Sequence, residues 1–103
     1  MSQPLTEAVF YILVALTEPL HGYGIMLKVS DMTHGRVSLA AGTLYGALSA
    51  LANKGWLDVD VVDDQKRYRL TDAGLAALRD EQERLTELAA HGRAALTERT
   101  THV

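Results

Sequence analysis

A mainly α-helical fold with one small β-hairpin is predicted by two periodicities in the 103-residue sequence. Along most of the chain, apolar residues recur at every third or fourth position, which is typical of helices with one face against a core. Between residues 57 and 70 the period changes to two, which is typical of a pair of strands. The length predicts one domain with a modest core.

The composition excludes several classes of protein. Apolar residues make up 48% of the chain and charged residues 22%, which indicates a folded globular protein rather than a disordered one. The chain has no cysteine, so it offers no disulfide, thiolate metal site or cysteine nucleophile. The longest apolar run, Ala8 to Leu16, is too short to span a bilayer and follows no basic segment. We therefore expect a soluble, cytoplasmic protein.

The first helix is expected to begin after the start signals Ser2 and Pro4 and to extend to about Thr17, before Pro19. One of its faces is formed by five apolar residues, Leu5, Val9, Ile12, Leu13 and Leu16. The opposite face is apolar as well, with Phe10, Tyr11 and Val14. A helix that is apolar nearly all round is usually buried on two sides. Because the domain is small, we expect the second face to contact a partner chain.

A second helix is expected to follow the turn at residues 20–24 and to extend to about Met32. Three of its residues recur at helical spacing and should face the core: Ile25, Val29 and Met32. The glycines of the turn, Gly22 and Gly24, do not form a nucleotide-binding loop, because neither a Walker lysine nor a third glycine at Rossmann spacing follows them. A polar turn and a short extended segment, residues 33–39, should lead to the next helix.

The third helix, from Ala40 to about Lys54 with Gly55 as its stop, has one nearly bare face. Three leucines and an alanine form the face toward the core: Leu44, Ala47, Leu48 and Leu51. The opposite face carries only small residues: Gly42, Thr43, Gly46, Ser49, Ala50 and Asn53. A glycine inside a helix lowers helix stability by about 1 kcal/mol relative to alanine. The two glycines on this face therefore indicate a role other than stabilising the helix. We infer close approach to another surface, with the DNA major groove as the first candidate.

Two strands are expected to pair, the first with its alternating residues at 57–61 and the second at 67–70, on either side of a four-residue loop, residues 63–66. The expected pairs are Val61 with Tyr68, Val59 with Leu70 and Asp60 with Arg69. One face of this hairpin would be apolar, and the other would carry an ion pair. Trp56, just before the first strand, is interpreted as a core residue.

The last helix is expected to be capped by Thr71 and Asp72. Its heptad-like stripe advances in steps of three and four residues: Leu75, Leu78, Gln82, Leu85, Ala89, Gly92 and Leu96, widened by Leu88. Gln82 and Gly92 interrupt the apolar residues of this stripe. A long helix with so narrow an apolar stripe is not buried by its own domain. We therefore expect the stripe to pack against a second copy of the chain. We divide the chain into a domain of residues 1–71 and a dimerisation helix of residues 72–103, which form a single structural unit. The predicted dimer contacts are Phe10, Tyr11, Val14, Leu78, Leu85, Leu88 and Leu96.

The order of three helices, a hairpin and a long helix is that of a winged helix-turn-helix with a C-terminal dimerisation helix. Four stretches carry a more specific resemblance: Leu20–Ile25, Gly42–Leu48, Leu51–Leu57 and Arg67–Gly74. In these stretches, and in their order, the chain resembles the compact members of the PadR family of transcriptional regulators. The resemblance implies a homodimer whose recognition helices enter DNA, often as a repressor. It also implies that an apolar ligand bound between the subunits can release the DNA, as in some members.

The candidate DNA contacts form two groups. Four residues on or beside the bare face should touch bases or groove walls: Thr43, Tyr45, Ser49 and Asn53. For Tyr45, packing under the second helix is an alternative. Five cations are candidates for the phosphate backbone: Lys28, Arg36, Lys54, Lys66 and Arg67. The net charge of −3 argues mildly against nucleic acid, although a local cluster of cations acts within a Debye length of about 8 Å.

We expect no catalytic residue, metal or cofactor. His21 is interpreted as a structural turn or capping residue, and the other histidines, His34, His91 and His102, share no metal-like spacing. No serine lies in a nucleophile elbow, and no paired carboxylates lie in an apolar setting. An enzyme is therefore not predicted.

The sequence as a whole predicts a dimeric DNA-binding transcriptional regulator, a repressor that binds an inverted repeat in double-stranded DNA. If a small apolar effector releases it, the ligand should touch Phe10, Tyr11 or Val14, because the core does not need those surfaces. The alternative is a winged-helix protein-interaction module without specific DNA binding. In that case the small-residue face would dock another protein, and the acidic net charge favours this alternative.

Overall fold

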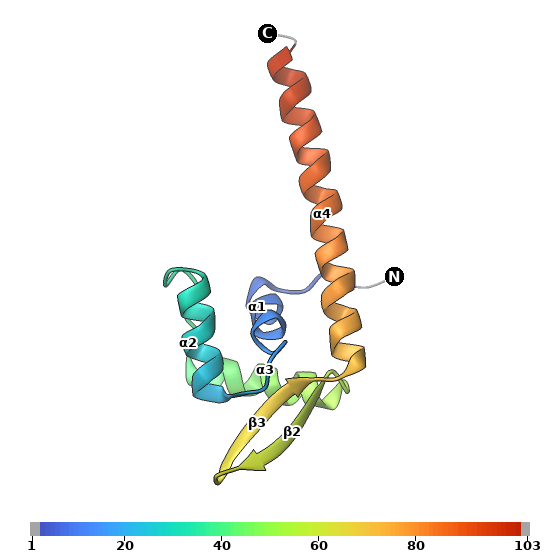
Figure 1. Cartoon of the computed structure of the whole chain (residues 1–103). Coiled ribbons are helices and arrows are strands. Elements are labelled where there is room, and N and C mark those ends of the chain that lie inside the picture. The colour runs from blue at the N-terminus through green and yellow to red at the C-terminus, as the bar shows by residue number, and fades with distance from the viewer. Residues whose placement is uncertain (1–2, 102–103) are drawn as a thin grey trace.

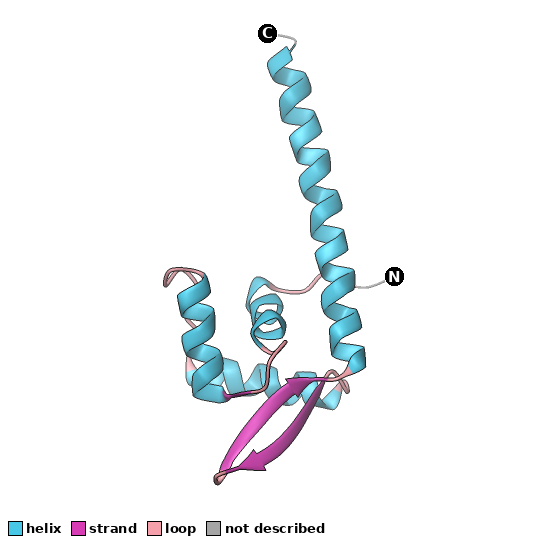
Figure 2. Ribbon diagram, viewed as in Figure 1, coloured by secondary structure: helices cyan, strands magenta, loops and turns pink. Residues whose placement is uncertain are grey.

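The computed structural model describes residues 3–101, which form four helices and three strands. The elements are α1 (Glu7–Ala15), β1 (Leu20–His21), α2 (Gly22–Met32), α3 (Ala41–Asn53), β2 (Leu57–Val62), β3 (Gln65–Leu70) and α4 (Asp72–Thr101). The strands form an antiparallel sheet in the order β1-β3-β2, and the β2–β3 hairpin extends away from the helices (Figure 2). This is the predicted winged helix-turn-helix, with α2 and α3 as the helix pair and β2–β3 as the wing.

The core lies among α1, α2 and α3 and is closed by the sheet. Seven of its side chains are almost completely enclosed: Ile12, Leu13, Leu16, Ile25, Val29, Leu44 and Leu48. Leu57 and Tyr68 contribute from β2 and β3. Burying one such aliphatic side chain contributes about 1.5–3 kcal/mol, so the leucines of α3 hold its inner face against the core. The small-residue face of α3 therefore points outward, as predicted.

Helices α1 and α2 differ from the prediction at their ends. Helix α1 begins at Glu7 rather than near Pro4, because the hydroxyl of Thr6 accepts a hydrogen bond from the Val9 amide (3.2 Å) and caps the helix. At the end of α2, Met32 is 36% exposed rather than buried; it is the last residue of the helix, and the core contacts of α2 come from Ile25 and Val29.

Strand β1 was not predicted. Leu20 and His21 lie in the stretch interpreted as a turn, yet they pair with β3, with Leu20 opposite Tyr68. Two residues are too few to show a period, so no local pattern could indicate this strand. Its pairing ties the start of α2 to the wing.

The predicted hairpin register is wrong by two residues. Strand β2 pairs with β3 so that Val59 lies opposite Tyr68 and Asp60 opposite Arg67. The turn contains two residues, Asp63 and Asp64, which have φ values of 52° and 62°. Two successive residues with positive φ close the tight turn that matches the twist of paired strands. Because the shift is an even number, each side chain keeps its predicted face.

Helix α4 begins as predicted and then leaves the body of the molecule. The Thr71 hydroxyl accepts a hydrogen bond from the Gly74 amide (3.1 Å) and donates one to the Gly55 carbonyl (2.6 Å). The first turns of α4 pass α1, and the remainder projects far beyond it (Figure 1). Gly74 is buried, and a methyl group there would collide with the backbone carbonyl of Trp56. Among residues 3–101, no helix is both long enough and apolar enough to cross a membrane.

Candidate nucleic-acid interface

The outer face of α3 is an exposed surface of small side chains. Its polar members, Thr43, Ser49 and Asn53, are all exposed. At Gly42 and Gly46, an added Cβ would have no atom of the described residues within 4 Å, apart from the glycine itself, its chain neighbours and the adjoining backbone of α3. These glycines therefore make no room for any described part of the chain, although each weakens the helix. The space in front of them is open to a second molecule.

Tyr45 lies on the flank of α3, between this face and α2. It is 47% exposed, and its ring lies over Gly22, where an added Cβ would be only 2.8 Å from the Tyr45 Cζ. The predicted alternative, packing under the second helix, is thus what the structure shows. The exposed remainder of the side chain still lies beside the face of α3.

A groove of about 350 Å³ adjoins Tyr45, and we call it the wing groove. Its lining comes from the start of α2, from α3 and from β3: His21, Gly22, Tyr23, Tyr45, Gln65, Lys66 and Tyr68. The Nδ1 atom of His21 donates a hydrogen bond to the Lys66 carbonyl (3.1 Å). His21 is therefore structural, as predicted, although it binds the wing and does not cap α2.

The wing has an acidic tip and ion-paired sides. Asp63 and Asp64 form the turn, and Arg67, predicted at the tip, lies opposite Asp60 instead. Arg67 Nη2 lies 3.0 Å from Asp60 Oδ2, and this guanidinium holds the pKa of Asp60 below its usual value. The predicted Asp60–Arg69 pair is wrong, because in the true register Arg69 pairs with Asp58 (3.7 Å). Lys66 is exposed on the same strand.

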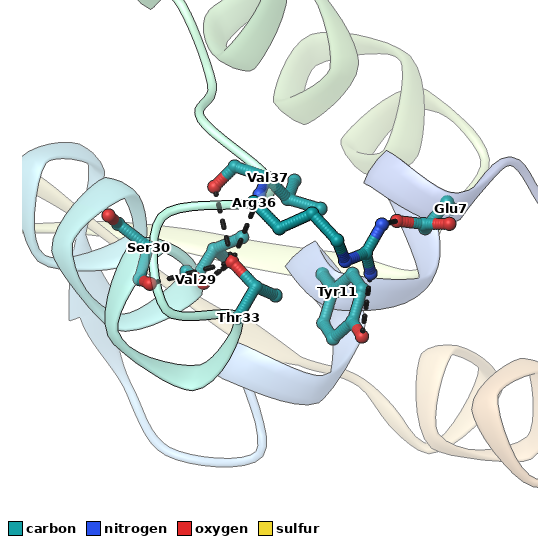
Figure 3. A network of polar contacts seen from close by, with 7 residues as sticks. All are labelled: Glu7, Tyr11, Val29, Ser30, Thr33, Arg36 and Val37. Atoms are coloured by element: carbon teal, nitrogen blue, oxygen red, sulfur yellow. Dashed lines mark hydrogen bonds and ion pairs between the residues drawn. The ribbon is translucent and has the colours of Figure 1, made fainter.

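The other predicted cations interact within the chain. Lys28 Nζ lies 2.8 Å from Glu18 Oε1. Arg36 forms an ion pair with Glu7 of α1 (2.6 Å), and its Nη2 lies 3.5 Å from the Tyr11 hydroxyl, as Figure 3 shows. The hydrogen bond to Glu7 raises the pKa of Arg36 above its usual value. Arg36 thus ties the end of α2 to α1, while Thr33 binds the same turn through its hydroxyl (Figure 3).

Lys54 and Trp56 lie at the end of α3. The Nζ atom of Lys54 is 4.8 Å from the centre of the Trp56 ring, so the ammonium group rests on the indole. Trp56 is half-buried against the core, which agrees with its predicted role. Lys54 itself is exposed.

The family model of the transcriptional regulator PadR-like family matches residues 11–80. The chain belongs to this family. Its members are transcription regulators rather than enzymes, which agrees with the prediction from the sequence. In a search of curated proteins, none matched the sequence.

Solved structures support the assignment to the PadR-like family. A PadR family transcriptional regulator from Eggerthella lenta is 27% identical, with a TM-score of 0.73, and the match covers 86% of this chain and 77% of that one. A PadR-like transcription factor from Bacteroides fragilis is 26% identical, with a TM-score of 0.75 and coverages of 85% and 88%. Bacillus subtilis PadR in complex with operator DNA is 25% identical, with a TM-score of 0.67. That match covers 75% of this chain and 47% of the longer one.

The predicted dimer residues of this PadR-like chain are partly uncovered in the single chain. Phe10, Tyr11 and Val14 are half-buried, and the rings of Phe10 and Tyr11 meet edge to face, with centroids 5.7 Å apart. Along α4 the exposure of the stripe rises toward the C-terminus. Leu78 is half-buried, whereas Leu85, Leu88 and Leu96 are 38%, 52% and 69% exposed.

A cavity of about 260 Å³, which we call the α1–α4 cavity, lies beside these residues. Its lining includes Phe10 and Tyr11 from α1 and Arg84 and Leu85 from α4. Val14, the third residue predicted to touch an effector, does not line it. Among the described residues, no cluster of histidine and carboxylate side chains could hold a metal ion.

Glu81 of the PadR-like chain is a buried carboxylate that was not among the predicted site residues. It is 3% exposed and accepts hydrogen bonds from the Leu5 amide (3.0 Å) and from Arg84 Nε and Nη2 (2.7 and 2.8 Å). The Arg84 guanidinium, more than the Leu5 amide, lowers the pKa of Glu81 despite its burial. The spacing of Glu81 and Arg84 could have indicated their ion pair. Nothing local could have indicated the bond to Leu5.

We expect the ionised Glu81 to stabilise the fold in a pH-dependent way. Because its pKa is lowered in the folded state, its contribution is complete above the unfolded value and is lost as the pH falls through the folded value. Urea unfolding of wild type and of Glu81→Gln should therefore differ most at neutral pH and converge in acid. A constant difference between the two proteins from pH 7 to pH 3 would contradict this assignment.

Proposed function

We propose that the chain is a dimeric transcriptional repressor that binds an inverted repeat in double-stranded DNA through the outer face of α3. One observation carries the proposal: Gly42 and Gly46 leave an open, small-residue surface that none of the described residues occupies. A helix can enter the major groove closely when its facing side chains are short. The operator complex of Bacillus subtilis PadR supports the same kind of partner for this chain. Since such a regulator acts on chromosomal DNA, we also propose a cytoplasmic location.

We propose two classes of DNA contact. Thr43, Ser49 and Asn53 are the candidates for base edges, with Tyr45 on the groove wall. Lys54 and Lys66, which are exposed, are the candidates for phosphates. Three further cations were predicted for the backbone, but they form ion pairs within the chain and are given no contact: Lys28, Arg36 and Arg67. The predicted dimerisation helix spans residues 72–103, of which 102 and 103 lie outside the described residues; α4 (Asp72–Thr101) sets the two α3 helices roughly 34 Å apart.

The first test is fluorescence anisotropy with a duplex from the region upstream of the protein's own gene and with a random duplex of equal length. We expect both to bind at low salt and the upstream duplex to bind more tightly. Binding of neither duplex at low salt would contradict the proposal. The net charge of −3 and the acidic wing tip would then favour the second candidate, a protein-interaction module.

Two variants separate base contacts from phosphate contacts. Asn53→Ala should weaken binding to the operator alone, by about 1–3 kcal/mol. Lys66→Ala should weaken binding to both duplexes about equally and should lower the steepness of the salt dependence by about one unit per site. Titrations at several salt concentrations measure both quantities. If Asn53→Ala lowered both affinities equally, its role would be structural.

We propose the α1–α4 cavity as the site of a small apolar effector. Phe10, Tyr11 and Leu85, three of the predicted dimer contacts, line it. Planar aromatic compounds should raise the melting temperature of wild type, and Tyr11→Ala should reduce this response. Val14→Ala, outside the cavity, is the matched control and should respond like wild type. A response unchanged by Tyr11→Ala would place the ligand elsewhere.

A further inference from the structure

The wing groove presents an uncapped helix N-terminus. The amides in the first turn of an α-helix have no acceptor within the helix. In the 11-residue helix α2, the N-cap residue His21 makes no side-chain cap, because its Nδ1 binds the Lys66 carbonyl instead. The first turn of α2 contains no acidic residue. The positive end of the helix dipole is therefore not neutralised, and such an end attracts anions.

Tyr68 is independent evidence for a ligand in this groove. Its side chain is 6% exposed and lines the groove, and its hydroxyl forms no hydrogen bond with any of the residues 3–101. Since no fully enclosed side-chain polar atom in that range lacks a partner, this hydroxyl must reach solvent, and the groove provides the opening. Through this opening the hydroxyl can donate a hydrogen bond to a water molecule or to a ligand bound in the groove.

The groove is suited to an acceptor that carries negative charge. Burial raises the pKa of Tyr68, with a smaller contribution from Tyr45, so its hydroxyl remains a donor at neutral pH. Lys66 adds a positive charge to the lining, and no carboxylate lines the groove among the described residues. At Gly22 the Tyr45 ring lies where a side chain would otherwise be, so Tyr45 forms one wall of the groove beside the start of α2.

We propose that the wing groove holds one phosphate of the DNA backbone, bound by the first amides of α2 and by the Tyr68 hydroxyl, with Lys66 supplying the neutralising charge. This inference rests on the proposed function. The groove lies between α3 and β3, so a strand that flanks the major groove occupied by α3 would pass it before reaching the wing. The phosphate would then fix the depth and angle of α3, whichever bases α3 reads.

The decisive variant is Tyr68→Phe, which removes the hydroxyl and keeps the ring that packs in the core. We expect the dissociation constants for operator and random duplex to rise together, by about 10-fold per half-site, because a hydrogen bond to a charged group is lost. The salt dependence should not change, because the lost group is neutral. Thr17→Val, which removes an exposed hydroxyl outside the wing groove, is the matched control and should bind like wild type. Thermal unfolding confirms that both variants are folded.

A second measurement identifies the phosphate. Methylphosphonate substitutions, which remove one charged oxygen, are scanned along the operator with wild type and Tyr68→Phe. At one position in each half-site, the two losses should not add, because both remove the same contact. Losses that add at every position would show that Tyr68 acts without touching a phosphate, and they would overturn the inference.

The remaining outcomes separate this inference from the proposed function. If wild type binds DNA and Tyr68→Phe binds it equally well, only the inference fails. If wild type binds no duplex at low salt, the proposed function fails first. Titration with inorganic phosphate, followed by the amide signals of Gly22 and Tyr23, distinguishes a free anion from the DNA backbone. If Tyr68→Phe weakened only the binding of inorganic phosphate, the groove would be a site for free anions, and the inference would be overturned.

Discussion

Leu85→Asp is expected to convert the protein from a dimer to a monomer. In a single chain Leu85 is 38% exposed on the apolar stripe of α4, next to the α1–α4 cavity. If a second copy covers this stripe, an aspartate there would be buried without a partner, once in each protomer, which costs several kcal/mol per charge. Sedimentation at micromolar concentration should show a dimer for wild type and a monomer for the variant.

The same variant should lose most of its affinity for the operator, because a monomer contacts only one half-site. Its affinity for random DNA should fall much less. Ala94→Asp is the matched control, since residue 94 is exposed on the opposite side of α4. It should remain dimeric and bind DNA. If wild type sediments as a monomer, the prediction that the operator is an inverted repeat fails as well.

Gly46→Leu is expected to abolish operator binding while leaving the free protein at least as stable as wild type. Apart from the chain neighbours and the adjoining backbone of α3, no atom of the described residues lies within 4 Å of an added Cβ at this position, so the helix gains up to about 1 kcal/mol when glycine is replaced. The melting temperature should therefore rise by roughly 4–8 °C per kcal/mol gained. On DNA, the added side chain would separate α3 from the base edges.

A variant that is more stable than wild type but binds DNA less tightly would show that the small-residue face of α3 serves DNA binding. Ala94→Leu adds the same side chain to an exposed position on α4 and should leave DNA binding unchanged. If Gly46→Leu bound the operator as tightly as wild type, α3 would not approach DNA with this face. If Gly46→Leu unfolded the protein, the position would be structural after all.

The sequence alone predicted the helices and strands whose residue patterns lie within a short stretch of the chain. The spacing of Leu44, Leu48 and Leu51 predicted which face of α3 is buried, and the short residues between them predicted the bare face. The Thr71 cap and the change to a period of two predicted the start of α4 and the wing. Each of these signals lies within one turn of helix or a few residues of strand, where the backbone conformation repeats and side-chain direction follows from position.

The tertiary structure decided which distant groups meet. The positive φ angles at Asp63 and Asp64 shortened the turn and set the register, so Arg67 pairs with Asp60. The Leu5 amide reaches Glu81, 76 positions away, and no periodicity encodes such a contact. The wing groove has the same origin, because its walls come from α2, α3 and β3, and only their packing brings Tyr68 to the start of α2. Local sequence determines the direction of each side chain, whereas its partner depends on how the finished elements pack.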